Sequence, residues 1–174
     1  MVEKLSVKRI NRLLTMMIEN MKYMDDDGRD LPIRWNIMHM YSSSQLAKLV
    51  ALRRGMDFEL AAIAGALHDI AVIIGKKTEQ HAEKSEPFLR DTIRTYNEAN
   101  NYSGMEISKE EEDILVKAIV NHSDKSNYTE DPFVELLKDV DSVDRYLHGI
   151  KTDEDYAKRC ERVFLELGIP IMDA

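Results

Sequence analysis

The stretch ALHDI, residues 66–70, places a histidine beside an aspartate inside a run that is otherwise almost wholly apolar, from Phe58 to Ile74. Burial of an unpaired carboxylate costs several kcal/mol or more, and burial of an unsatisfied imidazole is also unfavourable. His68 and Asp69 therefore need compensation. A hydrogen-bond network, an ion pair or a metal ion would each supply it.

The other histidines fall in a pattern that favours a metal site. The chain has five: His39, His68, His81, His122 and His148. The first four lie on four successive predicted helices, and the next predicted helix carries a dense acidic segment, residues 137–145. Helical bundles build metal sites from inward-facing side chains on neighbouring helices, and imidazole with carboxylate suits iron, manganese, zinc or nickel. A lone helical histidine is more often a surface or hydrogen-bonded core residue, and Asp141 with Arg145 could be an ordinary i, i+4 ion pair.

Helical periodicity of apolar residues runs along nearly the whole chain, with no alternating strand pattern. The pattern predicts one all-α domain, residues 1–174, of about six or seven helices. We expect a core bundle over 33–147, with an N-terminal helix at 3–24 and a C-terminal helix at 152–168 packed on it. The predicted core helices cover about 33–54, 57–74, 78–96, 108–122 and 132–147. Asp57 is expected to cap the second of these, and Ser108 with Glu111 forms a capping-box pattern.

Composition limits the class of protein. The chain of 174 residues is 44% hydrophobic and 32% charged, as expected of a soluble globular domain. The net charge of −8 argues against broad nucleic-acid binding. Cys160 is the one cysteine, which excludes an internal disulfide and is compatible with a reducing cytoplasm. We expect a cytoplasmic protein with no membrane partner; apolar positions on the first and last helices could serve a homodimer or pack on the bundle.

The order His39…His68-Asp69…Asp141 resembles the signature of the HD superfamily of metal-dependent phosphohydrolases. The segment MHMYSSSQLAKLVALRRGMDFELAAIAGALHDIAVIIGK is similar to the core of that family, and LLKDVDSVDRYL is similar to its closing element. The resemblance covers about residues 33–147 and implies an all-α bundle of the HD-domain type, which agrees with the periodicity.

The resemblance also implies a set of metal ligands. The ligands of a first divalent metal would be His39, His68, Asp69 and Asp141. Asp139 and Asp144 flank the last of these positions, and Asp141 matches best within KDVDSVD.

Members of the family with two metals have additional histidines before the last aspartate. TEQHAEKSEPFLRDTI and ILVKAIVNHS resemble those elements, which implies that His81 and His122 bind a second metal. Asp69 would then be the bridging ligand beside a metal-bound water. Iron or manganese is expected first, with zinc, nickel, cobalt or magnesium as alternatives, and a single metal with structural His81 and His122 stays open. His148 has no place in the pattern and is expected to be structural.

The activity implied is hydrolysis of a phosphoester or phosphoanhydride by metal-activated water, with a nucleotide or other small phosphorylated metabolite as substrate. The cations that could bind the substrate phosphate are Arg34, Lys76, Lys77, Lys125 and Arg145. Arg145 could instead orient Asp141. His122 is followed by Ser123, where the cyclic-di-GMP-cleaving branch has a doubled histidine, so that substrate is not expected.

Two other functions fit the same ligands. Some relatives use a mixed-valent di-iron pair to cleave a C–C or C–P bond with dioxygen, and oxygen dependence of turnover would distinguish them. A non-catalytic metal- or nucleotide-binding domain would bind ligand without turnover.

Overall fold

The computed structural model describes residues 6–101 and 103–170, which form eight helices and no strand. The prediction of an all-α fold is confirmed. The helices are α1 (Lys8–Met21), α2 (Ile33–Arg54), α3 (Phe58–Leu67), α4 (Ile70–Gly75), α5 (Ser85–Ala99), α6 (Lys109–Val120), α7 (Pro132–Leu147) and α8 (Glu154–Leu167).

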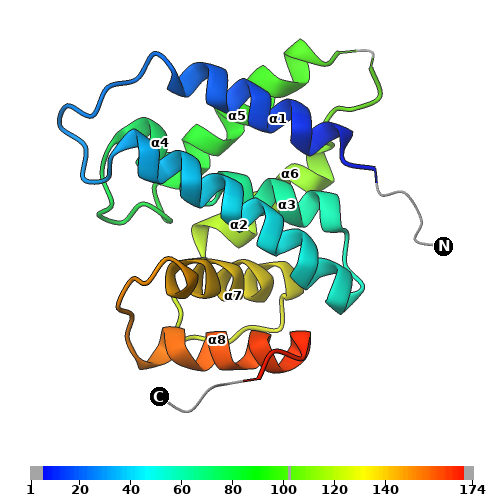
Figure 1. Ribbon diagram of the computed structural model, residues 1–174. Coiled ribbons are helices and arrows are strands. Elements are labelled where there is room, and N and C mark those ends of the chain that lie inside the picture. Colours follow the sequence, from blue (N-terminus) through cyan, green and yellow to red (C-terminus); the bar gives the residue numbers. More distant parts are fainter. Residues whose placement is uncertain (1–5, 102, 171–174) are drawn as a thin grey trace.

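The central pair of helices is α2 and α3, and the other helices are arranged around it (Figure 1). Helix α1 packs against α3 at one side, beside α5, and α7 lies against α2 at the opposite side with α8 beside it. Gly65 allows α3 to approach α2 closely, because a Cβ atom at this position would lie 2.7 Å from the carbonyl oxygen of Ser43. The two helices that carry His39 and His68 are therefore held at short range.

The predicted helix 57–74 is divided at His68 and Asp69 into α3 and α4. The imidazole of His68 donates from Nδ1 to the carbonyl oxygen of Gly65 at 2.8 Å. In an uninterrupted helix that carbonyl would accept from the backbone N–H of residue 69. Asp69 instead adopts φ −96° and ψ 23°, which are outside helical geometry. The helix is therefore interrupted at His68 and Asp69.

Two other helix boundaries differ from expectation. The helix predicted from residue 78 begins at Ser85, and residues 79–84 form turns, so His81 lies in a connection rather than in a helix. The first helix covers Lys8–Met21, and residues 3–5 of the predicted 3–24 lie outside the described part of the chain.

The expected helix starts are confirmed by their capping bonds. Asp57 accepts from the backbone N–H groups of Glu59 and Leu60, and Ser108 forms the reciprocal capping box with Glu111. Each such cap stabilises a helix by about 1 kcal/mol.

The apolar run Phe58–Gly75 is long and apolar enough to cross a membrane by length and composition alone. In the structure 83% of it is buried inside the protein, where it forms the centre of the bundle. A buried core helix passes the same test, so this run is weak support for a membrane span.

Candidate metal centre

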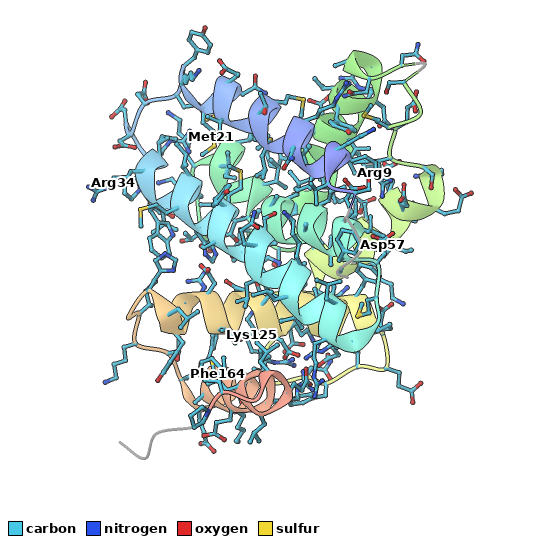
Figure 2. All side chains as sticks on the ribbon, turned by 45° about the vertical axis from the view of Figure 1, so that its right-hand side comes forward. Arg9, Met21, Arg34, Asp57, Lys125 and Phe164 are labelled. Atoms are coloured by element: carbon cyan, nitrogen blue, oxygen red, sulfur yellow. The ribbon has the colours of Figure 1, made fainter. Side chains whose placement is uncertain are left out.

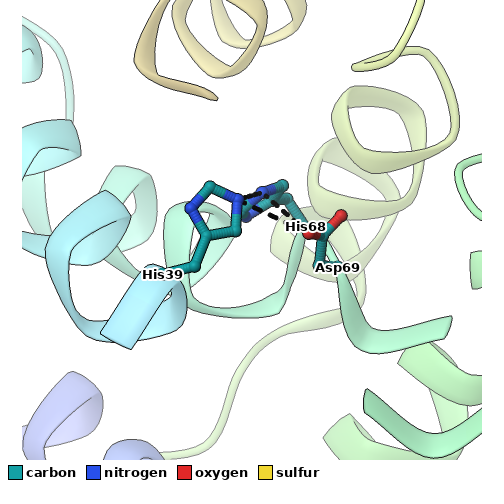
Figure 3. Close-up of side chains that lie close together, drawn as sticks. All are labelled: His39, His68 and Asp69. Atoms are coloured by element: carbon teal, nitrogen blue, oxygen red, sulfur yellow. Dashed lines mark hydrogen bonds and ion pairs between the residues drawn. The ribbon is translucent and has the colours of Figure 1, made fainter. Parts of the chain in front are cut away.

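The structure brings all six predicted ligands into one cluster, although they come from five separate segments. They are His39 on α2, His68 and Asp69 at the junction of α3 and α4, His81 before α5, His122 after α6, and Asp141 on α7. Three overlapping groups within this set place their donor atoms within 4.8 Å of one another: His39–His68–Asp69, Asp69–His81–His122 and His68–His122–Asp141. Figure 3 shows the first group, with the ring of His39 directed toward His68 and Asp69. All are buried except His81, which is partly exposed.

Each histidine is oriented by a hydrogen bond from Nδ1. His68, His81 and His122 each donate to the carbonyl oxygen of the residue three positions earlier, at 2.8, 2.8 and 2.6 Å. His39 donates to Oδ2 of Asp144 at 2.6 Å. A carbonyl or carboxylate oxygen only accepts, so the proton is fixed on Nδ1 and the lone pair of Nε2 faces the cluster. Metal-ligating histidines are oriented in the same way by such partners.

The Nε2 atoms meet in two close pairs. Those of His39 and His68 are 2.9 Å apart, and those of His81 and His122 are 3.1 Å apart. Two lone pairs at this separation repel each other unless a positive charge lies between them. The geometry of each pair therefore calls for a proton or a metal cation.

Asp69 stands between the two histidine pairs. Its Oδ2 lies 3.4 Å from Nε2 of His39 and 3.7 Å from that of His68. Its Oδ1 lies 3.1 Å from Nε2 of His81 and 3.6 Å from that of His122. Each carboxylate oxygen faces a different pair, and the buried Oδ1 has no hydrogen-bond partner among the described residues. A buried acceptor without a partner is costly, and a bound cation would satisfy it.

Asp141 completes the side of the cluster that carries His39 and His68. Its Oδ1 lies 3.2 Å from Nε2 of His39 and 3.6 Å from that of His68. The other oxygen, Oδ2, forms an ion pair with the buried ammonium of Lys125 at 2.7 Å, and Arg145 donates from Nε to Oδ1 at 2.9 Å. These cations hold the carboxylate in one orientation.

The pKa values show that the cluster attracts positive charge. Burial by itself lowers the pKa of His39, but its bonds to Asp141 and Asp144 raise that pKa to about 10. Burial lowers the pKa of His122 to about 4, so its imidazole is neutral and able to act as a ligand at pH 7. For His81 the effect of burial is outweighed by Asp69, which raises its pKa. In each close pair one imidazole thus favours a positive charge.

Three residues around His39 have supporting roles that the sequence pattern did not assign. Asp144 was placed beside the ligand position, and its role as the partner of His39 follows only from the structure. Trp35 stacks on the ring of His39, with ring centroids 5.4 Å apart and planes 17° apart. His148 donates from Nδ1 to the backbone oxygen of Asp144 at 2.9 Å and touches Trp35 edge-on. The i, i+3 spacing of Asp141 and Asp144 could have predicted the role of Asp144, because residues at this spacing lie on the same face of a helix.

The predicted phosphate-binding cations fall in two groups. Lys125 and Arg145 contact Asp141, as described above. Lys76 binds Asp25 at 3.3 Å and the backbone oxygen of Asp27 at 2.9 Å, and Lys77 binds Asp30 at 2.9 Å. These two lysines hold the connection before α2 against the end of α4, and neither contacts a cluster residue.

Arg34 is exposed, and its side chain extends outward from the start of α2, whereas Lys125, on the connection between α6 and α7, lies beside α7 (Figure 2). Contact of Arg34, Lys76 or Lys77 with a substrate stays a prediction.

The protein is an all-helical bundle whose centre contains four imidazoles and two carboxylates, and each imidazole is fixed through Nδ1. Proteins of this class can hold divalent metal. The family model of the HD domain matches residues 36–147, and the chain belongs to that family. Members of the family are typically metal-dependent hydrolases that bind divalent metals, and the histidine–aspartate groups of this chain could hold such ions. Among curated proteins no match is found, and among solved structures none is found either.

Proposed function

We propose that this protein hydrolyses a phosphoester or phosphoanhydride of a nucleotide or a related small metabolite, in the cytoplasm, with two divalent ions. We propose iron or manganese first, because imidazole with carboxylate suits both; zinc and nickel fit the same donors. The observation that carries the proposal is Asp69, whose two oxygens face separate histidine pairs. A carboxylate in this arrangement can serve two cations at once.

Each residue of the cluster has a role that follows from its contacts. A divalent ion bound at such a site lowers the pKa of coordinated water and polarises a phosphoryl oxygen. Asp69 and Asp141 supply the negative charge that holds the ions. Asp144 keeps the lone pair of His39 directed inward, and Lys125 fixes the orientation of Asp141 while adding a positive charge for an anionic substrate.

The decisive measurement is metal content per chain by elemental analysis, on protein purified in air and anaerobically. We expect two equivalents in the wild type and about one in His81→Ala. Asp91→Asn removes an exposed carboxylate on α5 and serves as the control, with metal content unchanged. One equivalent in the wild type, unaltered in His81→Ala, would contradict the dinuclear site.

Assays of turnover then distinguish the hydrolase from the oxygenase and from the binding domain. Phosphoanhydride and phosphodiester substrates are tested with each metal, with and without oxygen. Hydrolysis that is independent of oxygen supports the proposal. Turnover that requires oxygen would instead identify a di-iron oxygenase, and binding of nucleotide without turnover under any condition would identify a binding domain.

A further inference from the structure

Helix α8 lies outside the matched residues 36–147, yet it contacts the immediate surroundings of the metal centre. It packs against α7 and α2. Two of its side chains reach toward the cluster: Arg159, which is fully buried, and Tyr156, which is partly buried.

Arg159 fixes the loop that carries Lys125. Its Nε donates to the backbone oxygen of Lys125 at 2.8 Å, and its Nη2 donates to that of Asn127 at 3.2 Å. Its Nη1 binds Glu135 and Asp139 of α7, both at 2.9 Å. One buried guanidinium thus joins α8, α7 and the loop, and the position of Lys125 depends on it.

The ammonium of Lys125 retains an open donor. It forms an ion pair with Oδ2 of Asp141 at 2.7 Å and donates a hydrogen bond to the backbone oxygen of His122 at 2.6 Å. An ammonium has three N–H donors, so one is left. The ring of Tyr156 covers this ammonium, with its centroid 5.3 Å from Nζ.

Arg145 and Tyr156 carry further donors close to this ammonium: Arg145 pairs with Asp141, the partner of Lys125, and the ring of Tyr156 lies over the Lys125 ammonium. The guanidinium of Arg145 uses only Nε in its bond to Asp141, and its terminal nitrogens bond to no other described residue. The hydroxyl of Tyr156 likewise takes part in no hydrogen bond with the described part of the chain. Burial first, and then the charge of Asp141, raise the pKa of Tyr156 to about 12, so the phenol keeps its proton and can donate.

We propose that Lys125, Arg145 and Tyr156 form an oxyanion site that binds a phosphate group of the substrate beside the metal centre, which makes α8 part of the active site. This deepens, and rests on, the proposed hydrolase function. Hydrogen bonds from ammonium, guanidinium and phenol groups to the same anion are strong because the acceptor is charged. A phosphate held there lies next to Asp141.

The test is binding of inorganic phosphate, measured by isothermal titration calorimetry on the full chain loaded with manganese. We expect Tyr156→Phe, which removes only the hydroxyl, to weaken phosphate binding about 10-fold or more. Metal content should be unchanged, because Tyr156 contacts no predicted ligand. The control is Tyr146→Phe, which alters an exposed tyrosine of α7 and should bind phosphate as the wild type does.

The outcomes separate this site from the proposed reaction. Equal phosphate affinity in Tyr156→Phe and the wild type, or no measurable phosphate binding by the wild type, would overturn the oxyanion site even if the enzyme hydrolyses phosphoesters. Phosphate binding that depends on Tyr156, in a protein without any hydrolytic turnover, would support the site and reject the hydrolase.

Discussion

Nδ1 of His39 lies 2.6 Å from Oδ2 of Asp144, a residue 105 positions away in the sequence. The carboxylate fixes the imidazole tautomer in which Nε2 is free to bind a cation. Asp144 is itself buried and is contacted by His148, so its position is set on two sides.

Asp144→Asn should weaken metal affinity about 10- to 100-fold, which is the usual cost of losing such a supporting partner. The amide carries no charge, and it can donate to Nδ1 and so move the proton to Nε2. Competition with a fluorescent chelator measures the affinity. Asp113→Asn, an exposed carboxylate of α6, is the control. Wild-type affinity in Asp144→Asn would show that this contact does not support metal binding.

Gly65→Ala should destabilise the fold by about 1–3 kcal/mol and also weaken metal binding, because the new Cβ would lie 2.7 Å from the backbone oxygen of Ser43. Helices α2 and α3 would have to separate, and with them His39 and His68. Urea denaturation and metal titration check the two effects. Gly75→Ala is the matched control, since its Cβ would only touch Phe88 at an ordinary 3.6 Å. The prediction fails if the two variants behave alike.

Arg159→Ala should lower the free energy of unfolding by about 3 kcal/mol, because it leaves Glu135 and Asp139 with one fewer buried cation. Arg54 and Arg162 still pair with Asp139, which keeps the loss at the low end of the range for a buried ion pair. Chemical denaturation measures it. Arg94→Ala breaks only exposed ion pairs, which water and salt screen, and should change the free energy of unfolding far less than Arg159→Ala does. A similar loss in both variants would mean that the buried network contributes little.

Asp30 should make thermal stability depend on pH in the acid range. The backbone N–H of Thr78 and the ammonium of Lys77 lower the pKa of Asp30 from 3.8 to about 2. Its contribution is therefore present above about pH 4 and is lost as the pH falls toward 2. The melting temperatures of the wild type and Asp30→Asn should differ most above pH 4 and converge near pH 2. A constant difference between the two proteins across that range would exclude this contribution.

Much of the helical framework can be predicted from the sequence, because its signals are local. The bounds of α2 and α7, the cap at Asp57 and the capping box at Ser108 follow from residues a few positions apart. The predicted start of α5 at residue 78 was wrong, because the helix begins at Ser85. The turns before it include His81, which contacts Asp69, a residue that is distant in the sequence, and no local propensity predicts such a contact.

The helices, the order of the histidines and aspartates, and therefore the candidate metal ligands can all be inferred from the amino-acid sequence. Three relations become visible only in the folded protein: Asp69 faces two histidine pairs, Asp144 orients His39, and α8 fixes the loop of Lys125. Those relations join side chains that are far apart in the chain. Their geometry is set by how closely the helices pack, as at Gly65, and no local pattern of residues encodes that distance.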